Sequence, residues 1–269
     1  MEKRSAATAD SLREDLRRAG IDPHGVLLCH LSMKQIGPVD GGPDAVLDAL
    51  MSYMEDGLLV IPCHTWANVG AENPLFDVLA TKPCVGLLPD LFRRRPGVIR
   101  TLHPTHSLCV YGKGAEKFAA GQERFDTPCA PGSCYGELER RDAQVMMIGV
   151  TFACNTSVHC IEEVARVPNR LSREKQALRV RRADGTEIAV PSFRHENANS
   201  DYYVKLEPVM RWRGLLRETS FGAARTLLFR EKDLFRVTLE LLAKNPDLFG
   251  DGAPVPPTWY GERGAPSCG

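Results

Sequence analysis

An alternation of apolar runs and an amphipathic segment between residues 26 and 62 constrains the fold of this chain most strongly. Val26–Leu31 and Leu58–Pro62 are almost wholly apolar, as strands covered on both faces are. Between them lie a glycine-bearing loop over 32–42 and a segment from Pro43 with apolar residues at helical spacing. A strand, a helix and a second strand within about 35 residues form a βαβ unit. The sequence therefore predicts parallel strands covered by helices.

The rest of the chain extends this pattern and then departs from it. We expect further strands over 107–111, 144–150 and 225–229, a loop over 127–136, and helices over 10–19, 87–94, 115–120, 155–166, 202–212 and 232–243. The segments 176–180 and 186–191 flank Asp184-Gly185, and this arrangement predicts a hairpin. The expectation is an α/β fold with a central, mostly parallel sheet flanked by helices and an elaborated α+β C-terminal third. No linker composition divides it, so we expect a single domain over 1–269, with a Pro/Gly-rich tail after about residue 250.

Composition narrows the class of protein. Lys plus Arg (34) equals Asp plus Glu (34), so the net charge is zero and we expect no nucleic-acid partner. No apolar stretch approaches the length of a membrane span, and the first residues lack the apolar core of a signal peptide, so we expect a cytoplasmic protein that does not bind membranes. The nine cysteines include no CxxC pair, which favours reduced, mostly structural thiols.

The segment Arg100–Ser107 contains two imidazoles, three hydroxyls and a proline in eight residues. Histidine titrates near neutrality, so His103 and His106 in a stiff turn are candidates for acid–base chemistry. The alternative is that one of them ends a strand and the other packs under a loop.

A second candidate is His159, which follows the predicted strand over 144–150. Glu162 and Glu163 come three and four residues later, so either carboxylate can neighbour the imidazole on one face of a helix. A histidine held by a carboxylate can act as a general base, although a surface His–Glu pair has the same spacing.

Two further patterns are weaker. The loop from Ser32 to Gly42 has the placement of an anion-binding strand-to-helix turn but matches neither GxxxxGK[ST] nor GxGxxG, so a plain connection is equally compatible. Histidines also follow several strand-like runs, at His30, His64, His106 and His159, but no HxH or HExxH pattern supports a metal cluster.

Taken in order, the motifs resemble those of the aminoglycoside 3-N-acetyltransferase family over about residues 11 to 243. The matching stretches are His30-Leu31-Ser32, Ile36-Gly37, Gly41-Gly42, Leu59–Thr65, Asn73–Asp77, Phe92–Val98, Leu102–Ser107, Gly132-Ser133 and Asn155–His159 with Glu162. Two positions differ from many relatives, which have His in place of Gln122 and Pro in place of Cys134.

The resemblance implies acetyl transfer from acetyl-CoA to the amine of a small molecule, aminoglycoside-type or related, with antibiotic resistance as the associated role and no metal. It assigns His159 as the general base, with Glu207 as its supporting carboxylate, Glu162 as the local rival and His106 as a secondary catalytic candidate. The residues that it places around the coenzyme are Ser32, Met33, Lys34, Ile36, Gly37, Thr105, Ser107, Gly132 and Ser133.

The chemistry of this reaction sets one further expectation. An amine is mostly protonated at neutral pH and must lose a proton to attack a thioester, so a histidine base fits. Aminoglycosides are polycations, whereas the chain is neutral and its segment from Asn68 to Arg100 is basic, so a less cationic amine is a candidate acceptor. Two alternative functions stay open, a metal-dependent amidohydrolase and a non-catalytic CoA-binding protein. The sequence also leaves open a homodimer.

Overall fold

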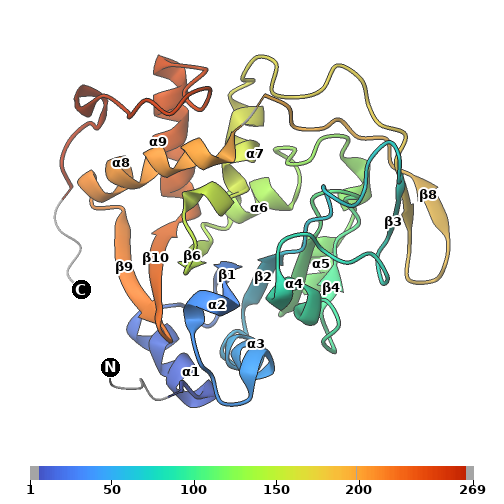
Figure 1. Cartoon of the computed structure of the whole chain (residues 1–269), viewed down its shortest axis with the longest axis horizontal. Coiled ribbons are helices and arrows are strands. Elements are labelled where there is room, and N and C mark those ends of the chain that lie inside the picture. The colour runs from blue at the N-terminus through green and yellow to red at the C-terminus, as the bar shows by residue number, and fades with distance from the viewer. Residues whose placement is uncertain (1–5, 198, 265–269) are drawn as a thin grey trace.

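A seven-stranded sheet forms the centre of the molecule in the computed structural model, which describes residues 6–197 and 199–264 (Figure 1). From one edge to the other, its strands are β4 (Ile99–Arg100), β5 (Leu108–Gly112), β2 (Leu58–Pro62), β1 (Val26–Leu31), β6 (Gln144–Ile148), β10 (Ala224–Arg230) and β9 (Leu216–Phe221).

Only the three middle strands of this sheet are parallel. β1 pairs in parallel with β2 on one side and with β6 on the other, whereas the outer strands all pair antiparallel. The tight connection at Gly222 joins β9 to β10, and a connection this short allows only an antiparallel pair. The α/β class with flanking helices is confirmed, but the sheet is mixed, with antiparallel pairs in the majority.

Helices cover both faces of the sheet. Successive side chains of a strand point to opposite faces, and accordingly Leu28 belongs to one apolar cluster while Leu27 and Cys29 belong to the other. The helices that contribute to the cluster of Leu27 are α1 (Ala9–Arg18), α2 (Met33–Ile36), α3 (Gly42–Tyr53) and α4 (Leu87–Phe92). Those that contribute to the cluster of Leu28 are α5 (Ala115–Ala119), α6 (Cys134–Arg140), α7 (Ser157–Val164), α8 (Leu206–Trp212) and α9 (Glu231–Lys244).

A small three-stranded sheet lies beside the main one, at the right of Figure 1. It consists of β3 (Leu75–Asp77), β7 (Arg179–Arg181) and β8 (Glu187–Ala189), with an apolar cluster of its own around Phe76 and Val180. The predicted hairpin at Asp184-Gly185 is confirmed, and Gly185 adopts a φ of 84°, which glycine tolerates without strain.

Several short elements differ from the expectation. α1 begins one residue before the expected start, because Thr8 caps it: the Thr8 hydroxyl accepts the N–H of Ser11. α6 begins inside the predicted loop over 127–136, where Ser133 caps it by accepting the N–H of Tyr135. The remaining short helices are η1 (Gln122–Arg124), η2 (Phe152–Cys154), η3 (Ser200–Lys205) and η4 (Pro257–Trp259). Within the described ranges, no helix has both the length and the apolar character that a membrane crossing needs.

Candidate active site

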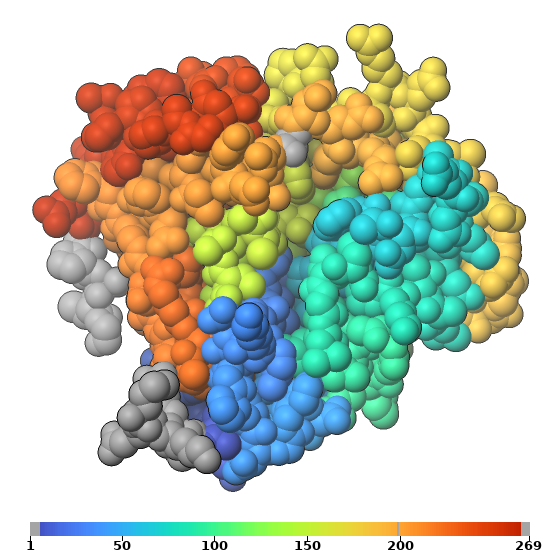
Figure 2. Space-filling model, viewed as in Figure 1, coloured from blue at the N-terminus to red at the C-terminus, as the bar shows by residue number. Residues whose placement is uncertain are grey.

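A cavity of about 470 Å³ opens where the three parallel strands end (Figure 2). Leu31 of β1, Pro62 of β2 and Val150, just after β6, all line it. Ligands of α/β sheets gather at the carboxyl ends of the strands, because loops there can converge from several strands. The polar side chains of the wall are those of His30, His64, Thr105, His106, Cys154, Asn155, Thr156, His159, Arg194, His195, Ser200 and Tyr203.

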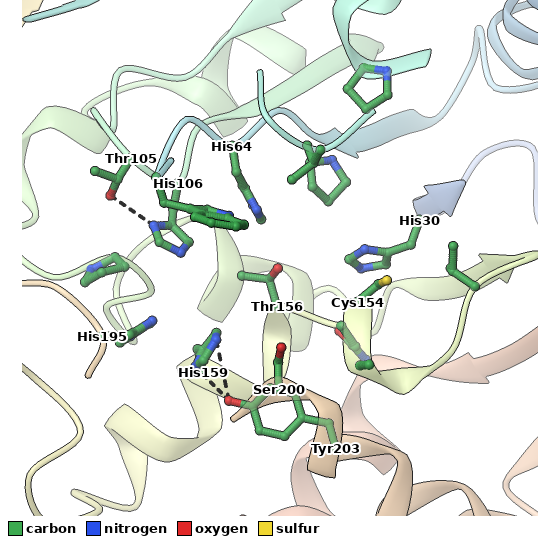
Figure 3. Close-up of a pocket in the computed structure, with 18 of the residues that line it drawn as sticks. His30, His64, Thr105, His106, Cys154, Thr156, His159, His195, Ser200 and Tyr203 are labelled. Atoms are coloured by element: carbon green, nitrogen blue, oxygen red, sulfur yellow. Dashed lines mark hydrogen bonds between the residues drawn. The ribbon is translucent and has the colours of Figure 1, made fainter. Parts of the chain in front are cut away.

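His159 lies in the first turn of α7 and points into this cavity (Figure 3). Its Nδ1 atom is 3.0 Å from Glu162 Oε2 and 2.8 Å from the Tyr203 hydroxyl, which itself donates to the same carboxylate oxygen at 2.8 Å. When Nδ1 carries the proton that Glu162 accepts, the lone pair of Nε2 is free to take a proton from a molecule in the cavity.

The carboxylate behind His159 is fully buried and is balanced by a cation. Glu162 has no exposed side-chain surface, and the nearly buried Arg170 places Nε 3.0 Å from its other oxygen. A buried ion pair holds its partners in place, because removing either one leaves an isolated charge in a low dielectric. Arg170 and Tyr203 thus fix the orientation of Glu162, and Glu162 fixes that of His159.

Four further imidazoles line the cavity, and all four are neutral at physiological pH. Burial lowers the pKa of His30 to about 4 and that of His64 to about 3, and it lowers the pKa values of His106 and His195 well below the usual value. The ring of His195 stacks on that of His159 with centroids 4.2 Å apart, and the ring of His106 lies 4.9 Å from that of His64. Their neutral rings supply ligand or hydrogen-bonding atoms without adding positive charge.

Glu163, the other carboxylate of the predicted pair, faces away from His159. Its Oε1 lies 2.8 Å from His195 Nε2 and accepts the N–H of Cys129, and its Oε2 accepts the hydroxyl of Thr127. Burial is the main cause that raises the pKa of Glu163 to about 7, against these hydrogen bonds. Consecutive glutamates of α7 thus hold two different histidines.

In the turn Arg100–Ser107, some residues line the cavity and others stabilise the turn itself. His103 is buried, and its Nδ1 accepts the backbone N–H of His106 at 3.1 Å, so it shapes the turn. Thr105 and His106 line the cavity. Ser107 is fully buried: its hydroxyl donates to the Cys63 carbonyl and accepts from Arg100, which gives it a structural place instead of a coenzyme contact.

The other residues expected around the coenzyme are spread over two loops. Ser32 and Met33 follow Leu31, a wall residue, and Lys34 is exposed on α2, whereas the side chain of Ile36 is buried in the core beneath Gly37. Gly132 packs against Phe125, and Ser133 is occupied in capping α6. Backbone groups of these loops are therefore better placed for a ligand than the side chains of Ile36 or Ser133.

The structure gives Glu207 different partners from those expected. It lies on α8, where its carboxylate accepts hydrogen bonds from Arg211 and Arg225, and Glu162 is the carboxylate that contacts His159. Gln122 does not line the cavity either: its side-chain oxygen accepts the N–H of Cys134. The two positions that depart from many relatives therefore contact each other, away from His159.

Sequence reasoning did not identify His195, Tyr203, Arg170 or Cys129. His195 and Arg170 come from the irregular segment between α7 and η3, where no periodicity marks a position as facing inward. Tyr203 falls in a predicted helix but carries no signal that separates it from a core aromatic residue, and Cys129 resembles the other buried cysteines.

A buried carboxylate, a histidine whose free nitrogen faces a cavity, and a mixed sheet whose parallel strands end at that cavity are the features of an α/β enzyme active site. The sequence profile of the aminoglycoside 3-N-acetyltransferase family matches residues 28–243. The chain belongs to this family.

Individual relatives agree with this assignment. Aminoglycoside N(3)-acetyltransferase IV of Salmonella sp is 28% identical over 237 residues, which cover 87% of each chain. The crystal structure of the apoenzyme of aminoglycoside acetyltransferase AAC(3)-IVa matches with a TM-score of 0.78 and 26% identity, covering 96% of this chain and 95% of that one. A mutant of the same enzyme in complex with a gentamicin matches with a TM-score of 0.80 and 25% identity over 93% of both chains.

Proposed function

We propose that this protein transfers an acetyl group from acetyl-CoA to an amine of a small molecule, with His159 as the general base. The observation that carries the proposal is the alignment of His159 between the cavity and the buried Glu162. Family membership supplies the reaction class, and the name of the Salmonella relative supports the same chemistry.

Acetyl-CoA supplies the acetyl group as a thioester, and the residues of the chain activate the amine. His159 Nε2 accepts the proton that the amine must lose, and Glu162, held by Arg170, stabilises the resulting imidazolium. Holding the amine and the thioester side by side supplies much of the remaining acceleration. Thr105, Thr156 and Ser200 place hydroxyls in the cavity wall, where a developing oxyanion needs donors.

Candidate coenzyme contacts are the backbone of residues 32–37, the side chain of Thr105 and the backbone of residues 132 and 133. Lys34 is the exposed cation of the first loop and suits a phosphate. The loop also fits a close approach, because Gly37 has a φ of 82° and presents no side chain.

The charges in the cavity wall indicate which acceptor amines the cavity can bind. Among the described residues that line it there is no Asp or Glu, and Arg194 is its one permanent cation. A polycation gains little in such a wall, so we propose that amines with few positive charges are accepted better than aminoglycosides.

The test is release of free CoA thiol from acetyl-CoA in the presence of a panel of amines, from monoamines to aminoglycosides. Release that depends on an amine, with a matching acetylated product in the mass spectrum, supports the function. No release with any amine of the panel overturns it. Higher kcat/KM for aminoglycosides than for every monoamine refutes the acceptor preference alone.

A further inference from the structure

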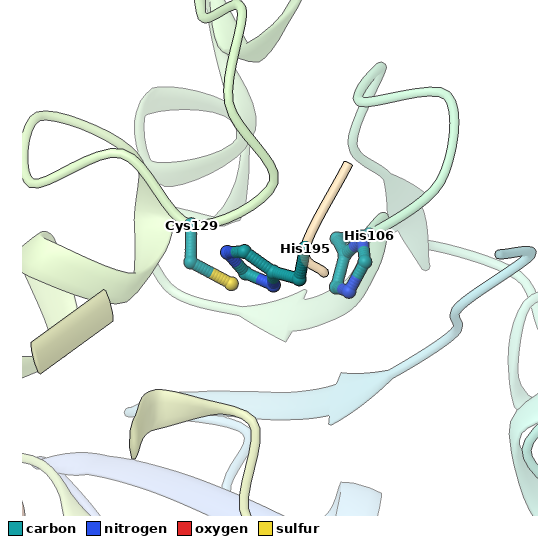
Figure 4. A group of neighbouring side chains, drawn as sticks. All are labelled: His106, Cys129 and His195. Carbon is teal, nitrogen blue, oxygen red and sulfur yellow. The ribbon is translucent and has the colours of Figure 1, made fainter. Parts of the chain in front are cut away.

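We propose that His106, Cys129 and His195 form a binding site for a thiophilic divalent metal ion, best suited to Zn²⁺, and that the bound ion competes with the amine (Figure 4). The three residues come from separate segments: the turn before β5, the loop before α6, and the loop after β8. Their potential ligand atoms all lie within 4.8 Å of one another. This differs from the expectation that the protein has no metal.

The spacing is close to what zinc requires. With Zn–N bonds of about 2.0 Å and Zn–S bonds of about 2.3 Å, neighbouring ligand atoms of a tetrahedral site are about 3.3–3.7 Å apart. The observed separations are at most 4.8 Å, so rotation of the two rings and the thiol has to shorten them by no more than about 1.5 Å.

In each of the two histidines, the ring nitrogen that would not bind the metal has a hydrogen-bond partner that holds the ring in place. Glu163 binds His195 at Nε2, which leaves Nδ1 as the ligand atom. This nitrogen is buried and has no hydrogen-bond partner in the part of the chain that the structure describes. The Thr105 hydroxyl lies 2.9 Å from His106 Nδ1, which leaves Nε2 free. A carboxylate on the far nitrogen of a histidine is the usual support of a metal ligand, because it fixes the tautomer and the orientation of the ring.

The donor set selects the class of ion. Two imidazoles and a thiol suit zinc and other ions that prefer nitrogen and sulfur, whereas Mg²⁺ and Ca²⁺ need oxygen ligands that this trio does not offer. Binding replaces the S–H bond of Cys129 by a metal–sulfur bond, and the thiol proton passes to the buffer.

The position of the site implies competition with the acceptor. His106 and His195 line the cavity whereas Cys129 is buried behind them, so the remaining coordination position of the ion faces the cavity. An ion there occupies space that the amine must enter. This part of the inference rests on the proposed function, whereas metal binding itself does not.

The test starts with metal-free full-length protein, titrated with ZnCl₂ by calorimetry and with CoCl₂ by absorption. We expect one Zn²⁺ per chain and a thiolate-to-cobalt charge-transfer band in the near ultraviolet. Cys129→Ser abolishes that band, and Glu163→Gln, which keeps all three ligands, weakens zinc binding about 10–100-fold.

Two other cysteines serve as matched controls. Cys154, which is exposed and lines the same cavity, is the rival thiol, and Cys84 is a partly buried thiol outside the trio. Cys154→Ser and Cys84→Ser retain the cobalt band. Loss of the band in either control, with retention in Cys129→Ser, overturns the assignment. If Cys129→Ser does not fold, His195→Gln decides, since unchanged zinc affinity in that variant also overturns it.

The activity readout separates the two proposals. Zinc at saturating concentration raises the apparent KM for the amine at least tenfold in the wild type, and the effect is lost in His195→Gln. Zinc binding without any acetyl transfer refutes the proposed function and leaves the metal site standing. Acetyl transfer without zinc binding refutes the metal site alone.

Discussion

Two histidine–glutamate pairs lie side by side at the cavity, and their surroundings differ. The imidazoles of His159 and His195 line the wall, whereas the two glutamates, which are consecutive residues of α7, lie behind them. Glu162 holds His159 and is balanced by Arg170 and Tyr203. Glu163 holds His195, and among the described residues its further hydrogen-bond partners are the Thr127 hydroxyl and a backbone N–H. The contacts behind each carboxylate therefore matter more than the His–Glu distance, which is 3.0 Å in one pair and 2.8 Å in the other.

The difference appears in the charge of each pair. A cation beside Glu162 keeps a negative charge available to stabilise an imidazolium at His159. Burial raises the pKa of Glu163 to about 7 and lowers that of His195, so the second pair is easily held neutral. A neutral imidazole suits metal ligation, whereas a carboxylate that is balanced by a cation suits a base, because it stabilises the protonated imidazole.

The largest expected effect is on catalysis. His159→Ala removes the base and lowers the rate of acetyl transfer by about 10²–10⁴-fold, measured as thiol release at saturating acetyl-CoA. His24→Ala, at an exposed histidine far along the sequence, is the matched control. A loss of less than tenfold in His159→Ala removes this residue from the base role.

The next effect is on stability. Arg170→Met leaves Glu162 as an unpaired buried charge and lowers the free energy of unfolding by about 3–5 kcal/mol. Thr127→Val removes one hydrogen bond from Glu163 and costs about 1 kcal/mol. Urea denaturation of both variants measures the contrast, and equal costs contradict the view that only the first pair holds a full charge.

The pH dependence of stability tests the second pair. A carboxyl whose pKa is raised on folding binds its proton more tightly in the folded state, so its contribution to stability falls as pH rises between about 4.5 and 7. Glu163→Gln removes this loss. We expect the stability difference, variant minus wild type, to grow by up to about 3 kcal/mol from pH 4.5 to 7.5. Unfolding in urea at several pH values checks this, and a difference that is flat with pH places the titration elsewhere.

The smallest expected effect compares the two glutamates directly. Glu162→Gln preserves shape but removes the charge behind His159, which lowers kcat about 10–100-fold with little change in KM. Glu163→Gln lowers kcat less, because His195 is not the base. Comparable losses of kcat in the two variants contradict the proposal that Glu162, and not Glu163, supports the base.

Much of the fold follows from local patterns. Val26–Leu31, Leu58–Pro62 and Gln144–Ile148 are apolar enough to be recognised as covered strands, and the helix from Pro43 shows its spacing plainly. β9 and α6 were not predicted because neither has a distinctive local pattern: β9 alternates only weakly, and α6 follows a loop rich in Pro and Gly. Their structure depends on neighbours that are distant in the sequence.

The sequence by itself determined the class of fold, the family and the pairing of His159 with a carboxylate of its own helix, because these depend on ordered motifs and on spacing within one helix. It also offered Glu162 and Glu163 equally, since both lie within reach of His159 along a helix. Only the tertiary structure decided between them. Arg170 and Tyr203 meet Glu162, and His195 meets Glu163, because long-range packing and not local spacing sets which charges and rings converge at the ends of the parallel strands.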